Sequence, residues 1–161
     1  MYGIDLPNLT AGNHSITSPQ DEHYNCVSHA VHEDQVSLWP DDNNSWPEEL
    51  PRVETIDAFV RFFTLIGFEE IPITATKITP GYEKIAIFAE AGAFPTHVAR
   101  QLDGGRWTSK LGILVDIGHA DLHCLEGGEY GYVVRLMRRR HHGGPPKLPK
   151  IAPQKPLIIR P

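Results

Sequence analysis

The sequence predicts a single α+β domain in which helices come first and an antiparallel β-sheet follows. Three observations support this class. Apolar residues recur at helical spacing between residues 25 and 67. The pattern changes to short apolar or alternating runs between residues 84 and 137. Finally, Asp103-Gly104-Gly105 is typical of a turn that joins two antiparallel strands. Helices followed by paired strands define the α+β class.

Two helices are predicted in the first half of the chain. Asn25 is a suitable N-cap for a helix that continues to about Leu38, shortly before Pro40. A loop rich in proline and acidic residues, with two tryptophans, follows over 39–51. The second helix is capped by Thr55, carries apolar residues at helical spacing and ends at Gly67.

The second half of the chain predicts strands. Residues 84–89 form a largely buried strand, and 96–102 with 106–110 form a hairpin around the Asp-Gly-Gly turn. A short helix is expected over 117–125, ending at Gly127-Gly128, and a last strand over 130–137.

Three segments differ in composition: an irregular N-terminal arm at 1–20, a folded domain at 21–140 and a Pro-rich basic tail at 141–161. Six of the 14 prolines follow Arg140, which predicts a flexible tail. The net charge of −5, with eight cations and no acids after Glu129, leaves −13 for the rest. A basic tail can bind a polyanion, but a solubilising extension is the simpler interpretation, and we expect no nucleic acid partner.

Composition also limits the compartment. The chain has 161 residues, 40% hydrophobic and 22% charged, which is ordinary for a globular domain. No apolar run reaches the roughly 18 residues of a spanning helix, and the N-terminus lacks the pattern of a signal peptide. We therefore expect a cytoplasmic protein, or one exported without a signal peptide, that has no membrane partner. The two cysteines, Cys26 and Cys124, are expected to be free thiols.

The candidate chemistry is a pairing of Cys26, at the start of a predicted helix, with His97, at the start of a predicted strand. A thiol is nucleophilic as the thiolate, and a helix N-terminus with a nearby imidazole lowers its pKa. A catalytic imidazole also needs a partner on its other ring nitrogen. The hairpin brings Ser109 near His97, whereas Asp116 is the chemically stronger partner at an unknown position.

Four further residues are candidates for contact with substrate. Gln20 and Asn25 can supply amide donors to an oxyanion, and Trp39 and Trp107 are the aromatic candidates. For the Trp39 loop, pinning of the loop to the core is the simpler interpretation.

A zinc site is the rival interpretation of the histidines. His23, Cys26, His29 and His32 are spaced by three, and a second group contains His119, His123 and Cys124. The spacing matches no compact zinc template, so we predict no metal and no cofactor.

Several motifs carry a resemblance to an uncharacterised bacterial domain family over about residues 20–137. They are Tyr24-Asn25-Cys26, the Trp/Pro-rich segment, Pro95 to Gln101, Trp107 to Gly112, and Asp116-Ile117-Gly118-His119. More distantly, the order of helix cysteine, strand histidine and polar residue on the next strand resembles NlpC-type and papain-like thiol hydrolases. In the NlpC group the third position maps onto Ser109, where histidine, asparagine or glutamine is usual. The spacing of Gln20 from Cys26 is similar to that of the papain oxyanion glutamine.

This resemblance implies a papain-like fold, with a Cys-bearing helix packed on an antiparallel sheet. It also implies a cysteine hydrolase or amidotransferase that acts on amide bonds of a peptide, a protein or a peptidoglycan peptide. Two other interpretations remain open: a catalytically inactive binding module with the same fold, and a zinc-binding domain. The sequence does not indicate an oligomeric state.

Overall fold

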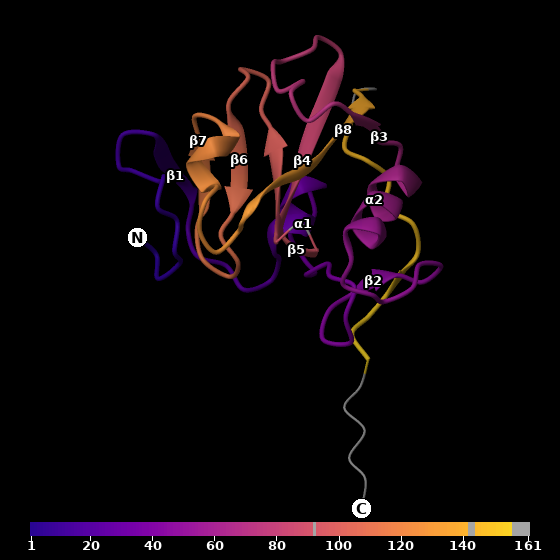
Figure 1. Ribbon diagram of the computed structural model, residues 1–161. Helices are drawn as coiled ribbons and strands as arrows, with labels where there is room; N and C mark the ends of the chain where they lie inside the picture. The colour runs from indigo at the N-terminus through magenta and orange to yellow at the C-terminus, as the bar shows by residue number, and fades with distance from the viewer. Residues whose placement is uncertain (92, 142–143, 156–161) are drawn as a thin grey trace, which may run out of the picture.

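The protein is built around one antiparallel sheet (Figure 1). This computed structural model describes residues 1–91, 93–141 and 144–155. The strand order of the large sheet is β1-β7-β6-β5-β4-β8-β3, and every neighbouring pair is antiparallel. The strands are β1 (His14–Ser18), β3 (Glu69–Ile71), β4 (Tyr82–Glu90), β5 (Phe94–Gln101), β6 (Trp107–Lys110), β7 (Asp116–His119) and β8 (Tyr132–Arg140). A second, two-stranded sheet pairs β2 (Trp46–Pro47) with β9 (Ile151–Ala152). The α+β class is confirmed.

The first helix, α1 (Cys26–Ala30), is much shorter than predicted. The helix ends because the following loop folds back onto its first turn. The Ser28 hydroxyl donates to the carbonyl of Val36 at 2.7 Å, and the N–H of Leu38 donates to the Ser28 hydroxyl oxygen at 3.0 Å. His32, just beyond the helix, has a φ of 63°, which turns the chain away from helical geometry.

The second helix, α2 (Ile56–Leu65), confirms its prediction. The Thr55 hydroxyl accepts a hydrogen bond from the N–H of Ala58 at 3.1 Å, and Gly67, with a φ of 104°, ends the helix. The buried face of α2 carries Phe59, Phe62 and Phe63, which belong to the hydrophobic core on its side of the sheet.

The sheet separates two hydrophobic clusters. Side chains alternate between the faces of a strand, so Ile85 and Ile87 of β4 join the cluster beneath α1 and α2, whereas Ala86 and Phe88 join the other cluster. The second cluster is completed by the N-terminal segment, with Leu6, and by η1 (Leu122–Leu125), a turn of 3₁₀-helix. Both faces of the central strands are therefore covered.

Three predicted segments need correction. The N-terminal arm is not irregular throughout, because β1 pairs with β7. The segment 117–125 is not one helix but the end of β7 followed by η1. The tail is ordered where it is described: β9 pairs with β2, and Arg52 Nη2 donates to the carbonyl of Pro153 at 2.8 Å. Residues 156–161 lie outside the described part of the chain.

The hairpin of β5 and β6 is confirmed, as are the strands matching β4 and β8. Among the described residues, no helix has the length and apolar character that crossing a membrane would need.

Candidate thiol site

Cys26 is the first residue of α1, and Asn25 fixes the start of that helix. The Asn25 Oδ1 atom accepts from the N–H groups of Ser28 at 3.1 Å and of Leu38 at 3.2 Å, while Nδ2 donates to the Leu38 carbonyl at 2.8 Å. The Asn25 amide therefore caps the helix and anchors the loop, rather than being free to donate to an oxyanion. Gln20, the other expected donor, is exposed.

The Cys26 thiol is buried, with 6% of the residue exposed. The sulfur lies near the backbone N–H of Val98 in β5, and burial raises the pKa of Cys26 to about 11. This direction is opposite to the one expected for an activated thiol. Both cysteines are free, as expected, and Cys124 is also buried.

β5 and β6 bring His97 and Ser109 together, as the hairpin predicted. His97 Nε2 lies 2.9 Å from Ser109 Oγ. His97 is 1% exposed, and its Nδ1 has no hydrogen-bond partner within the described residues. Burial lowers the pKa of His97 well below its ordinary value, with additional contributions from His119 and His29. The imidazole is therefore neutral at neutral pH.

Aromatic rings fix the plane of the His97 imidazole. The Tyr130 ring is stacked on it, with centroids 4.3 Å apart and an interplanar angle of 8°. The Phe88 ring meets the imidazole edge-on, with the ring centroids 5.4 Å apart. Cys26 and His97 belong to α1 and β5, which pack against each other. In the described part of the chain, however, no hydrogen bond joins the two side chains.

His119 is a member of this site that sequence reasoning missed. Its Nε2 lies 2.8 Å from Ser109 Oγ, and its Nδ1 lies 2.9 Å from the carbonyl oxygen of Asp121. The sequence named His119 as a candidate zinc ligand and as part of a family motif, but not as a neighbour of Ser109, because 117–125 was predicted to be a helix. A strand in that position would have placed His119 beside β6, opposite Trp107.

Asp116 belongs to a different cluster from His97. Its Oδ2 accepts hydrogen bonds from the hydroxyls of Tyr24 at 2.6 Å and Ser18 at 2.5 Å, and His29 Nδ1 lies 3.7 Å away. Asp116 joins β7 to the segment before α1, and the described contacts link it to no atom of His97. The structure thus places Ser109, and not Asp116, against His97.

His23, His29 and His32, which belong to the first group of zinc candidates, do not gather around a metal position. His29 Nε2 lies 2.9 Å from Thr108 Oγ1, and burial lowers the pKa of His29 to about 4. His23 is exposed beside Asp21, and Nε2 of His32 lies 3.7 Å from Oε2 of Glu83. Over residues 1–91, 93–141 and 144–155, no group of three His, Cys, Asp or Glu residues is arranged to hold a metal ion.

The two candidate tryptophans lie with different clusters. Trp39 is half-buried, donates from Nε1 to Glu54 at 2.7 Å and meets Phe59 of α2 edge-on, with centroids 4.9 Å apart. It therefore attaches its loop to the helical side of the domain, as the simpler interpretation held. Trp107 is buried in the second cluster, on the other side.

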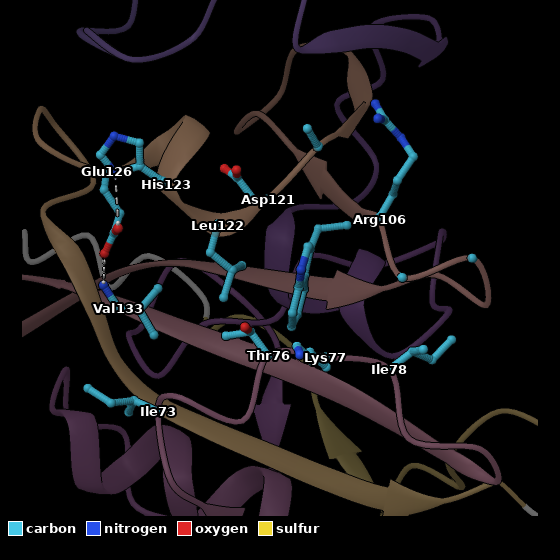
Figure 2. Close-up of a pocket in the computed structure, with 14 residues that line it drawn as sticks. Ile73, Thr76, Lys77, Ile78, Arg106, Asp121, Leu122, His123, Glu126 and Val133 are labelled. Carbon is cyan, nitrogen blue, oxygen red and sulfur yellow. Dashed lines mark hydrogen bonds and ion pairs between the residues drawn. The ribbon is translucent and has the colours of Figure 1, made fainter.

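A cavity of about 870 Å³ lies over that second cluster, between the segment 73–78, the turn at 104–106 and η1. Trp107 and Leu122 give it apolar walls. Lys77 and Arg106 also line it, and neither forms an ion pair with any described residue. The Glu126 carboxylate accepts a hydrogen bond from the backbone N–H of Val133 in β8 at 3.0 Å. Figure 2 marks this bond with a dashed line. Cys26, His97, Ser109 and His119 do not line this cavity, so it is not a cleft leading to the thiol.

Comparison with the curated proteins and with the solved structures found no match. A family model described as "Domain of unknown function (DUF7689)" matches residues 15–138, from β1 into β8. This range is more than half of the chain and includes Cys26, His97, Ser109 and His119. The chain therefore belongs to the DUF7689 family.

Proposed function

We propose that this domain is a papain-like, thiol-dependent enzyme that cleaves or transfers amide bonds of a peptide or protein, with Cys26 as nucleophile and His97 as base. The observation that carries the proposal is the state of His97. Ser109 holds Nε2, while the buried Nδ1 has no partner among the described residues. Leaving a buried polar atom unpaired costs about 1–3 kcal/mol, so such an atom calls for an explanation. The explanation that we propose is that Nδ1 is the basic atom that accepts a proton during the reaction.

The position of Cys26 supports the same chemistry. The thiol lies near the N–H of Val98, the residue that follows His97. The raised pKa of Cys26 and the lowered pKa of His97 describe a neutral thiol and a neutral imidazole. Such a pair reacts by general-base catalysis, in which the proton moves as the sulfur attacks, rather than from a preformed ion pair.

In the proposed reaction, the protein, the substrate and water or an amine account for every bond and every proton. The Cys26 sulfur bonds to the carbonyl carbon, and its proton passes to His97 Nδ1. His97 returns this proton to the departing amine nitrogen as the C–N bond breaks, which leaves a thioester. Water, or an amine in a transfer reaction, then attacks the thioester and gives its proton back through His97 to the Cys26 sulfur.

The test is alkylation of the native protein by chloroacetamide at pH 7, read by mass spectrometry, with Cys124 as internal reference. We expect Cys26 to react faster than Cys124, and His97→Ala to slow Cys26 at least tenfold without changing Cys124. His23→Ala removes an exposed histidine three residues from Cys26 and serves as the matched control. Labelling of Cys26 that is no faster than that of Cys124 and is indifferent to His97→Ala would refute the proposal.

The second candidate is a binding module of the same fold without catalysis. It is favoured by two observations: the described residues show no hydrogen bond between Cys26 and His97, and the cavity in Figure 2 lies elsewhere. The refuting outcome of the alkylation test is the result this candidate predicts.

A further inference from the structure

His97, Ser109 and His119 form a buried chain of hydrogen bonds that ends on a backbone carbonyl. All three side chains are fully or almost fully buried, so water does not compete for these bonds. The final contact, from His119 Nδ1 to the carbonyl oxygen of Asp121, has only one possible direction. A carbonyl oxygen accepts and cannot donate, so His119 Nδ1 carries a proton.

The position of that proton determines the next one. Burial lowers the pKa of His119 to about 4, so the ring is neutral at neutral pH and its Nε2 is a lone pair. The Ser109 hydroxyl lies 2.8 Å from this nitrogen and has a single proton to donate. Ser109 therefore donates to His119.

The Ser109 hydroxyl in turn fixes the proton of His97. With its proton given to His119, the Ser109 oxygen accepts from His97 Nε2, which lies 2.9 Å away. His97 Nε2 is then protonated, and Nδ1 of the neutral ring is the lone pair. This is the nitrogen without a hydrogen-bond partner among the described residues.

We propose that His119 is a positioning residue for His97: acting through the Ser109 hydroxyl, it holds His97 in the tautomer whose basic nitrogen is Nδ1. The use of that nitrogen by Cys26 rests on the proposed function, whereas the tautomer itself does not. The inference also accounts for a serine at a position where a stronger partner was expected. A serine hydroxyl can donate or accept toward an imidazole, and the second histidine removes this ambiguity.

The test is ¹⁵N NMR of the imidazoles in the histidine-labelled full chain at pH 7, with His97 assigned through His97→Gln. We expect His97 to be a single Nε2–H tautomer and His119 a single Nδ1–H tautomer. In His119→Phe the hydroxyl loses its acceptor, so His97 should shift toward a mixture of tautomers. His119→Gln, whose side-chain oxygen can accept from Ser109, should restore the single tautomer.

Two results would overturn the inference. One is an Nδ1–H tautomer of His97 in the wild-type protein, which needs no variant to fold. The other is an unchanged tautomer in folded His119→Phe and Ser109→Ala proteins. A role in packing alone would not move the tautomer. Because no reactive thiol enters this experiment, it can succeed where the alkylation test fails, and the two proposals stand or fall separately.

Discussion

Replacing Cys26 by alanine isolates the ionisation of one buried thiol. Burial raises the pKa of Cys26 in the folded protein from an ordinary value of 9.0 to about 11, so the folded state holds the thiol proton more tightly than the unfolded chain. For a group with a raised pKa, the stabilisation is fully present below the unfolded value and is lost as the pH rises through the folded value. The wild-type protein should therefore lose stability in alkali that Cys26→Ala does not lose.

The magnitude follows from the two pKa values. A separation of about two pKa units corresponds to about 3 kcal/mol of unfolding free energy once the pH exceeds both pKa values. Between pH 8 and pH 10 only the unfolded thiol ionises extensively. Over that interval the wild-type protein should lose about 1 kcal/mol more of its unfolding free energy than the variant.

Urea unfolding followed by tryptophan fluorescence at intervals from pH 7 to pH 10.5 measures this difference. Contributions from Cys124 and from the tyrosines occur in both proteins and cancel in the comparison. A lowered thiol pKa alone would reverse the slope, because the wild type would then gain stability relative to the variant as the pH rises. A difference that is flat, or that has this reversed sign, refutes the assignment of a neutral, buried thiol.

Three substitutions and one control substitution test the architecture around the site, each by thermal or urea unfolding. Gly131→Ala should destabilise the protein by at least about 2 kcal/mol, because φ is 68° and a Cβ would lie 2.1 Å from the carbonyl oxygen of Ala89, whereas Gly104→Ala, with open space around it, should be close to neutral. Asn25→Ala should cost about 1–2 kcal/mol for the lost cap, and faster cleavage of the loop at 31–38 by protease should accompany it; an unchanged cleavage rate would contradict the anchoring role. Trp46→Ala should cost about 3–5 kcal/mol, because its fully buried indole stacks on α2; a cost under 1 kcal/mol would show that the packing is looser than described.

The sequence predicted the elements whose information is local. α2 carries its own cap, apolar face and terminating glycine, and the β5–β6 hairpin carries its own turn, which also placed Ser109 against His97. The pairings missed were distant in sequence. α1 ends early because the Ser28 side chain binds a loop eight to ten residues later. β1 has little strand signal of its own and is held by β7 about a hundred residues away.

For the site, the sequence identified the residue types but not their burial, their protonation or their hydrogen-bond partners. A buried thiol with a raised pKa differs from an activated one only through its surroundings, which periodicity does not report. His119 was missed for the same reason, since its role depends on the register of β6 and β7. Asp116 was the better orienter by chemistry alone, but the hydroxyls of Tyr24 and Ser18 donate to its Oδ2 atom, and no described contact joins it to His97.

The pairing of β1 with β7 has a consequence for synthesis on the ribosome. The register joins His14 to His119, so β1 has no partner until most of the chain has been translated. Contacts this distant in sequence slow folding, because the loop between them must close first. Ser109 and His119 also emerge late. The nascent chain therefore carries Cys26 in an incomplete fold, with a solvated thiol near its ordinary pKa, and an oxidant or electrophile can reach this cysteine more readily during translation than after release.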